Sequence, residues 1–240
     1  MFNRFLKPET RYAKRMARIK RWDAPIADPG ERLRAHVNML FVDHGIFRAI
    51  YLNRHKVTDK FWRAAQPSPS DIKRMADSGI KTVINLRGGR EHGSWPLQRD
   101  ACRQHGIVLT EFIVRSREAP ARETIRAAKE LFETVEYPVL VHCKSGADRA
   151  GLMSALYLIL HEGLSVDEAS QQLSLRYGHF RFAKTGILDA FFDLYREEGQ
   201  AGGLDFLTWV ETVYEPDKLK ARFRAGFWSG LLVDRVMKRE

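Results

Sequence analysis

Cysteine is scarce in this sequence, and long apolar runs are missing from it. Among 240 residues the only cysteines are Cys102 and Cys143, too few for the disulfide framework of a small secreted protein. No run approaches the length of a transmembrane helix, and residues 1–8 lack the continuous apolar core of a signal peptide. We therefore expect the chain to work in a reducing, cytoplasmic compartment.

Internal repeats and low-complexity tracts are also absent, whereas 44% of the residues are hydrophobic. A chain of this length and composition is expected to form one domain with a sizeable core, together with extensions. The formal net charge of +10 is unevenly placed. Between Met1 and Trp22, eight basic residues stand against the single acid Glu9. Much of the positive charge therefore lies near the N-terminus, outside the expected core.

Short apolar segments alternate with amphipathic ones through the middle of the chain. This pattern predicts strands at 81–86, 107–114 and 137–141. Helices are predicted at 69–78, 99–105, 122–136, 152–160, 165–178 and 187–198, with one or two more between 31 and 52. Strands separated by helices predict an α/β fold, in which a mostly parallel central sheet is flanked by helices.

The segment from His142 to Gly151 joins a predicted strand to a predicted helix. Backbone N–H groups of such a turn, together with the positive end of the helix dipole, form a cradle for a phosphate dianion and stabilise a thiolate at Cys143. The planar guanidinium of Arg149 can hold two phosphoryl oxygens. This spacing indicates a phosphate-binding catalytic loop. The alternative is that Cys143 is a small buried apolar residue, which is the common state of a free cysteine.

The motif His-Cys-x5-Arg, followed by an apolar helix, resembles the signature of the cysteine-dependent phosphatases, which include protein tyrosine and dual-specificity phosphatases. The resemblance covers roughly residues 58–198, and residues 61–68 and 79–87 are similar to the opening of compact dual-specificity phosphatases. It implies a dual-specificity phosphatase-like fold over 58–200. The basic residues outside this range predict a basic helical extension over 1–57 and a basic amphipathic extension over 201–240. A rhodanese-like sulfur-transfer loop is a further alternative, but it requires another loop length.

The resemblance also implies roles for the residues of the loop. Cys143 is the expected nucleophile, Arg149 binds phosphate, and the intermediate is a cysteinyl phosphate formed without a metal or cofactor. His142 is expected to orient the loop. The remaining loop residues expected to surround the substrate phosphate are Lys144, Ser145, Gly146 and Ala147.

The general acid is less clear from the sequence. Related phosphatases carry an aspartate on the loop after the strand that precedes the catalytic one, but here residues 115–120 contain no aspartate. Glu118 is the nearest substitute on this loop, and a solvated surface carboxylate is its alternative reading. Asp148 is the rival, because Cys-x-x-Gly-x-Asp-Arg resembles loops of phosphoinositide and bacterial lipid phosphatases. Its alternative role is to brace the loop.

Ala150 departs from the family pattern, which has serine or threonine after the arginine. Without that hydroxyl the hydrolysis of the intermediate is expected to be slow, unless Ser145 compensates. A pseudophosphatase that binds phosphorylated partners without turnover is therefore a second class of function to consider. The intact pair of Cys143 and Arg149 argues against it.

Charge favours a polyanionic or membrane-borne phosphomonoester as the substrate. Lys144 lies within the loop, while Arg87, Arg90 and Arg117 are expected on flanking loops. We expect a lipid-linked or inositol phosphate, with a phosphoprotein as the alternative. The basic segments at both ends predict helices on an anionic membrane surface, peripheral to the inner face of the membrane. A solvated basic arm is the alternative, nucleic acid ranks below both, and the oligomeric state is open.

Overall fold

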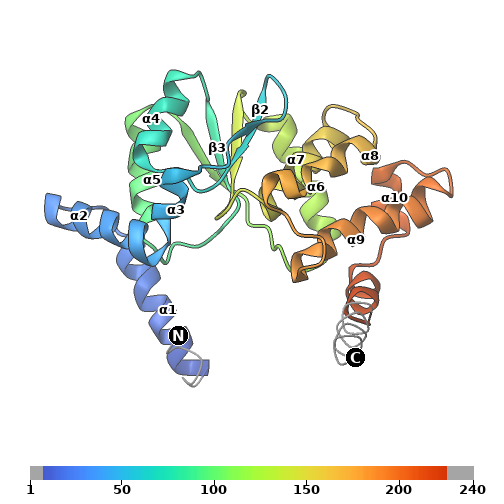
Figure 1. The fold of residues 1–240 in the computed structure, drawn as a ribbon, viewed down its shortest axis with the longest axis horizontal. Coiled ribbons are helices and arrows are strands. Elements are labelled where there is room, and N and C mark those ends of the chain that lie inside the picture. The colour runs from blue at the N-terminus through green and yellow to red at the C-terminus, as the bar shows by residue number, and fades with distance from the viewer. Residues whose placement is uncertain (1–7, 226–240) are drawn as a thin grey trace, which may run out of the picture. The chain divides into compact units, whose positions relative to one another are not determined.

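The structure, a computed structural model that describes residues 8–225, contains a five-stranded sheet in the order β1-β2-β5-β3-β4 (Figure 1). The strands are β1 (His55–Lys56), β2 (Phe61–Ala64), β3 (Thr82–Asn85), β4 (Val108–Glu111) and β5 (Val139–His142). β1 pairs with β2 in antiparallel fashion, whereas the remaining strand pairs are parallel. The predicted α/β class with a mostly parallel sheet is confirmed.

The register of the sheet aligns the loops that follow its central strands. β3 and β5 are buried at every position, as their runs of aliphatic residues require. Ala64, His142 and Asn85 lie level with one another at the carboxyl ends of β2, β5 and β3. The three following loops therefore begin at the same edge of the sheet, which is where parallel sheets carry their ligand sites.

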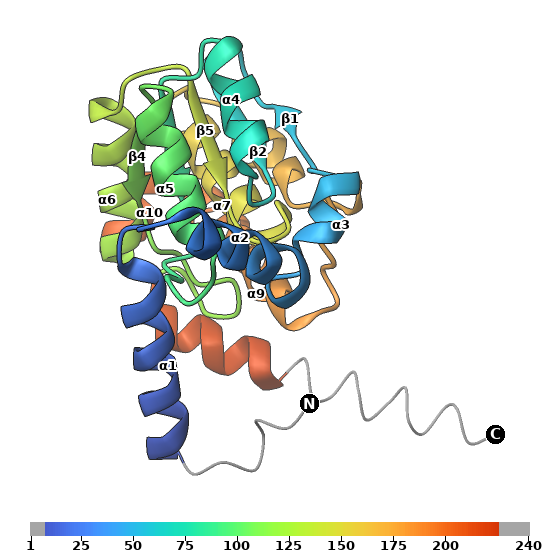
Figure 2. The same ribbon diagram turned by 90° about the vertical axis from the view of Figure 1, so that its left-hand side faces the viewer.

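Two helices lie side by side against this sheet, α4 (Pro69–Asp77) and α5 (Ser94–Gln104) (Figures 1 and 2). A capping box between Ser68 and Asp71 starts α4 and satisfies two of its orphan N–H groups. The shared core includes Ile72 and Met75 from α4 and Cys102 from α5. Helix α4 thus begins and ends close to its predicted bounds.

The described part of the N-terminal segment is helical and packs against α5. It comprises α1 (Pro8–Asp23), α2 (Pro29–Val37), a π-helix (Asn38–Val42) and α3 (Gly45–Ile50). Trp22, Ala35 and Met39 form a buried cluster with Leu97 of α5. Because this segment shares a core with α5, its packing crosses the expected boundary near residue 57, and that boundary stays a prediction.

The chain forms two compact units, and all five strands belong to the first. The first unit comprises the residues up to Ile113 together with Glu136–Gly146, and the second comprises Val114–Val135 and the residues from Ala147 onward. The helices of the second unit are α6 (Arg122–Thr134), α7 (Asp148–Leu160), α8 (Val166–Ala169), α9 (Ile187–Leu194), which continues into a π-helix (Tyr195–Gln200), and α10 (Phe206–Thr212). A further helix covers 216–225.

Aromatic side chains hold this second unit together. Phe132 of α6 meets Tyr157 of α7 edge to face, with ring centroids 5.4 Å apart. Trp209 of α10 is fully buried and packs against Phe191 and Tyr214. The C-terminal basic helix was predicted for residues 219–239, of which those beyond 225 lie outside the described residues.

Two predicted helices differ from the observed ones. The α-helix expected at 165–178 ends at Ala169, and a short 3-10 turn continues it to Gln172. The chain leaves helical geometry at Leu173 and Ser174, and a second 3-10 turn follows at Leu175–Tyr177. Helix α5 starts at Ser94 rather than Arg99. Pro96 falls within its first turn, where a missing N–H has no partner to lose. Within residues 8–225, no helix is both long and apolar enough to cross a membrane.

Candidate active site

The loop that begins at Cys143 leaves the sheet edge directly after β5. Gly146 has a φ of 76°, and its backbone N–H donates to the Cys143 sulfur over 3.3 Å. A Cβ atom at Gly146 would lie 2.7 Å from the backbone nitrogen of Ala65. Only glycine accommodates both the left-handed backbone and this close approach. The loop therefore curls tightly enough to direct an amide at the sulfur, as the predicted cradle requires.

Three consecutive backbone carbonyl groups of the loop accept hydrogen bonds from residues outside it. The Asn53 side chain donates to the Ser145 oxygen (2.9 Å), and fully buried Arg63 donates to the Gly146 oxygen (2.8 Å). The backbone N–H of Gln66 donates to the Lys144 oxygen (3.4 Å). Because the carbonyls are held in this way, the loop keeps one backbone conformation.

His142 is buried and precedes the loop on β5. The Gln98 amide donates to its Nε2 atom at 2.6 Å, and Gln66 in turn donates to the Gln98 oxygen at 2.9 Å. This chain of hydrogen bonds fixes the imidazole ring beside Cys143. The geometry suits the expected orienting role of His142, which remains a prediction.

The second half of the signature opens helix α7. Ala147 is the N-cap residue, Asp148 and Arg149 lie in the first turn, and Ala150 is fully buried. At thirteen residues α7 has a full macrodipole, whose positive end coincides with the residues expected to bind phosphate. Arg149 lies in this first turn, and its role as phosphate ligand stays a prediction.

Asp148 is engaged by a histidine that no motif in the sequence singles out. His179 is buried between two carboxylates, with Nδ1 2.7 Å from Asp148 Oδ1 and Nε2 2.7 Å from Asp189 Oδ2. Burial lowers the pKa of His179, but the hydrogen bonds to both carboxylates outweigh it and raise the pKa to about 9. His179 is therefore an imidazolium at neutral pH and donates from both nitrogens. This arrangement suits the bracing role of Asp148 better than proton donation.

Glu118 and Arg117 lie on the loop between β4 and α6, as expected. The Glu118 carboxylate is 46% exposed and forms an ion pair with Arg115 at 2.8 Å. Arg117 is exposed. Both side chains face solvent, and their roles as acid and substrate ligand stay predictions.

A buried carboxylate beside Lys144 was missed from the sequence. Asp43 follows the π-helix and has no exposed surface. Its two oxygens accept a bidentate pair of 2.7 Å hydrogen bonds from Arg87, and Arg48 lies 3.0 Å away. The Lys144 Nζ atom approaches Asp43 to 3.6 Å. Although burial raises the pKa of Asp43, these arginines lower it well below its usual range.

Two arginines that were expected to attract substrate are engaged in ion pairs within the protein. Arg87 was expected to attract substrate, but its side chain is only 9% exposed and is committed to Asp43. Arg90 pairs with Asp23 at 3.0 Å and also with Glu111. Neither is a free cation for a substrate. Lys144, with 43% of its side chain exposed, is the member of the Asp43 cluster that meets solvent most openly.

The second cysteine, Cys102, lies outside the signature loop. Cys102 is buried in the core beside α4, and burial raises the pKa of its thiol to about 12. It is therefore an unreactive thiol at neutral pH. Across the described residues, no group of three or more histidine, cysteine or acidic side chains is placed to hold a metal ion.

Comparisons with known proteins agree with this geometry. The family described as DSP-PTPase phosphatase fused to NAD+ kinase matches residues 47–187, more than half of the chain. Inositol diphosphatase DSP4 of Arabidopsis thaliana is 28% identical over 130 residues, which are 52% of this chain and 56% of DSP4. Dual specificity protein phosphatase TpbA of Pseudomonas aeruginosa is 24% identical over 125 residues, which are 51% of this chain and 53% of TpbA.

A solved structure shows the same fold. The crystal structure of P. aeruginosa TpbA has a TM-score of 0.50 at 20% identity and covers 63% of this chain and 88% of the TpbA chain. The sequence matches span little more than half the length of DSP4 and TpbA.

Proposed function

We propose that this chain, which belongs to the family of DSP-PTPase phosphatases fused to NAD+ kinase, hydrolyses a lipid-linked or inositol phosphate through a cysteinyl-phosphate intermediate. The observation that carries the proposal is the loop after β5, in which the Gly146 amide donates to the Cys143 sulfur. A hydrogen bond of this kind stabilises a thiolate, which is the nucleophilic form of cysteine.

The reaction has two steps. The Cys143 thiolate attacks phosphorus, the bond from phosphorus to the leaving oxygen breaks, and that oxygen takes a proton from an acid. Water then attacks the cysteinyl phosphate, the bond between sulfur and phosphorus breaks, and inorganic phosphate leaves. Arg149 and the loop amides stabilise the charge on the non-bridging oxygens in both steps.

The proton donor is Glu118 or Asp148, and the structure supports them differently. Asp148 accepts a hydrogen bond from the charged His179, whereas Glu118 is half exposed and forms an ion pair with Arg115. We assign the acid to Glu118 and the bracing role to Asp148. On an alkyl phosphate, whose leaving group needs a proton, Glu118→Gln is expected to lower kcat more than on an aryl phosphate. Asp148→Asn should lower both rates alike, and the opposite pattern reverses the assignment.

Lys144 supports a polyanionic substrate. Lys144 follows Cys143 in the sequence, and its side chain is about two-fifths exposed. Its ammonium group forms an ion pair with the buried Asp43. It supplies positive charge for a second phosphate or a lipid headgroup. The name of the relative DSP4, an inositol diphosphatase, supports the same substrate class.

A phosphate-release screen across phosphopeptides, inositol phosphates and phospholipids tests this proposal, with Cys143→Ser as the blank. Lys144→Ala is expected to raise KM for a substrate with several phosphates by about tenfold, and to change KM for a phosphopeptide much less. Lys81→Ala, which changes an exposed lysine away from the loop, is the matched control. Preference for phosphopeptides would instead favour the second candidate, a protein phosphatase, which the name of the relative TpbA supports.

The buried Ala150 supports a candidate function of another class, a pseudophosphatase that binds phosphorylated partners without turning them over. Ala150 has no hydroxyl to assist departure of the thiolate. Release of one equivalent of the leaving alcohol per protein, without release of phosphate and without further turnover, would favour a pseudophosphatase. Steady release that is abolished in Cys143→Ser supports the enzyme.

We also propose that the basic face of α1 meets an anionic membrane surface, which places the protein at the cytoplasmic face of a membrane. Arg15 and Arg18 are partly committed to Glu91, but Lys14, Lys20 and Arg21 are exposed. Binding to anionic vesicles and to RNA should be compared at matched salt, because screening weakens both. Tighter binding to RNA would overturn this proposal.

A further inference from the structure

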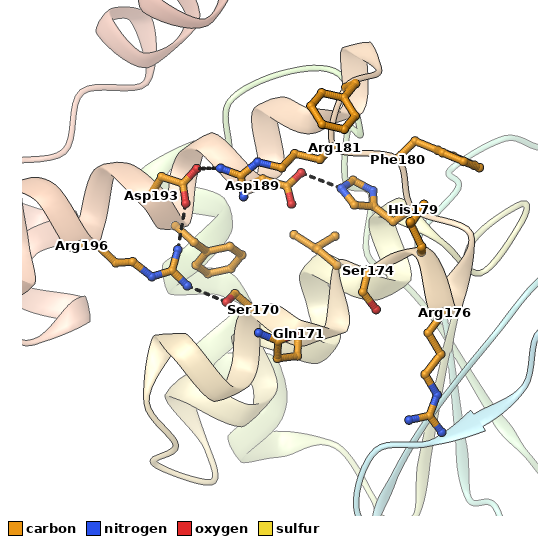
Figure 3. A pocket seen from close by; sticks show the side chains of 14 residues that line it. Ser170, Gln171, Ser174, Arg176, His179, Phe180, Arg181, Asp189, Asp193 and Arg196 are labelled. Atoms are coloured by element: carbon orange, nitrogen blue, oxygen red, sulfur yellow. Dashed lines mark hydrogen bonds and ion pairs between the residues drawn. The ribbon is translucent and has the colours of Figure 1, made fainter.

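A cavity of about 910 Å³ lies in the second unit, apart from the residues assigned to phosphate chemistry (Figure 3). Its walls are the two 3-10 turns after α8, the loop at 178–183, α9 and Arg196. The volume falls within the range of small-molecule sites. Leu173 and Phe192 are buried in its wall, whereas Leu175, Phe180 and Phe182 are 71%, 59% and 94% exposed. Exposed apolar side chains gathered around a cavity mark a binding surface.

The charged groups of the wall are nearly all neutralised by one another. Asp193 pairs with Arg181 at 2.5 Å and with Arg196 at 2.9 Å, while His179 pairs with Asp189 (Figure 3). Ion pairs of this kind leave little charge to recognise a ligand. They define the shape of the wall and keep its polar atoms satisfied.

Arg176 is the exception. It is exposed, it lies on the side of the cavity opposite Arg196 with its guanidinium at the outer edge in Figure 3, and no described residue forms an ion pair with it. Its guanidinium rests over the Tyr177 ring, with 5.6 Å between the carbon and the ring centroid. A cation held in this way beside an apolar cavity complements a ligand with an apolar body and an anionic end.

We propose that this cavity binds a single-chain anionic amphiphile, such as a fatty acid, with the chain among the apolar wall residues and the anionic group on Arg176. A peptide fits the wall less well. Its backbone carries a donor and an acceptor at each residue, which lose free energy when they are buried without partners. The charged wall groups other than Arg176 are already bonded, and this part of the unit offers no strand edge for pairing.

The site is independent of the phosphatase reaction but borders its loop. His179 belongs to the cavity wall and also donates to Asp148. The proposal does not rest on catalysis, since Cys143→Ser protein should bind the amphiphile as the unaltered chain does. A failure of phosphatase activity and a failure of this site are therefore distinguishable.

Isothermal titration of the full chain with dodecanoate, below its micelle concentration, tests the proposal. One saturable site is expected. Arg176→Ala should weaken binding roughly tenfold, as loss of a charged hydrogen bond does, and Arg176→Lys should restore most of it. Leu175→Asp should abolish binding, and because Leu175 is 71% exposed, the thermal unfolding of this variant should be unchanged. Phe182→Ser serves as a second variant of the apolar wall.

Two controls complete the experiment. Arg224→Ala, which changes an exposed arginine outside the cavity, should leave dodecanoate binding unaltered. Dodecyltrimethylammonium, with the same chain and the opposite charge, should bind at least tenfold more weakly. Equal affinity for the two amphiphiles, or normal binding by Arg176→Ala, would overturn the proposal. Tighter binding of an aromatic, anionic peptide that displaces dodecanoate would identify a peptide site and would also overturn it.

Discussion

The two ends of the signature loop are held by different physics. The cysteine end, Cys143–Gly146, is fixed by hydrogen bonds to its backbone carbonyls and by the close approach of Gly146 to Ala65. The arginine end, Ala147–Arg149, carries Asp148, which is fixed by an imidazolium between two carboxylates. Backbone hydrogen bonds of this kind persist across pH, whereas an ion triad depends on the charge of its histidine. The cysteine end therefore depends on close packing and backbone hydrogen bonds, whereas the arginine end depends on the charge of His179.

The largest effect on the catalytic rate is expected from Gly146→Ala at the cysteine end. The added Cβ meets backbone atoms at 2.7 and 2.8 Å, and the φ of 76° is strained for alanine. The loop must shift, and a displacement of about 1 Å costs on the order of a hundredfold in rate. Steady-state kcat measures this loss, with Gly163→Ala as control, since a Cβ there meets nothing within 4 Å. Equal losses in both variants would show that backbone strain alone, without the close approach, explains the effect.

Asp43→Asn tests the support beneath Lys144. Asparagine keeps the size of the side chain but removes the charge that neutralises buried Arg87 and Arg48. Breaking a buried ion pair on one side destabilises by about 3–5 kcal/mol, so urea unfolding should shift strongly. Asp77→Asn, at an exposed ion pair with Lys73, should shift it by less than about 1 kcal/mol. Similar changes in the free energy of unfolding for both variants would show that Asp43 does not stabilise the fold.

The arginine end is expected to weaken in alkali. The pKa of His179 is raised to about 9 in the folded chain, above its ordinary value of 6.5, so its contribution is complete below about pH 6.5 and is lost as the pH rises through 9. Thermal unfolding followed from pH 6 to 10 should show a falling Tm in the unaltered chain. His179→Gln should remove this part of the dependence, and an unchanged pH profile in that variant would refute the triad.

Ala150→Ser should produce the smallest change and acts on the second chemical step. A hydroxyl beside Arg149 can donate to the departing sulfur, so hydrolysis of the intermediate should become several-fold faster. Rapid-quench measurement of the initial burst of the leaving phenol from an aryl phosphate checks this, since the burst should shrink relative to the steady rate. A burst and steady rate that stay unchanged would show that the missing hydroxyl does not limit turnover.

These comparisons also show what the sequence was able to predict. The signature loop, the mostly parallel sheet and the capping box of Ser68 could be predicted because each leaves a local pattern in the sequence. The superfamily predicted from His-Cys-x5-Arg is confirmed. Asp43 and His179 were missed because each has a partner that is distant in the sequence. Asp43 meets Lys144 across about a hundred residues, and neither residue lies in a periodic pattern. Long-range pairs between charged side chains leave no trace in local spacing.

The central claim is that Cys143 carries the phosphoryl group. Acid quenching of the chain during turnover, followed by peptide mass spectrometry, tests it most directly, and Ala150 favours accumulation of the intermediate. The account predicts phosphate on Cys143 and none on Cys102, with no adduct and no phosphate release in Cys143→Ser. Phosphate release that persists in Cys143→Ser, or an adduct on another residue, would contradict it.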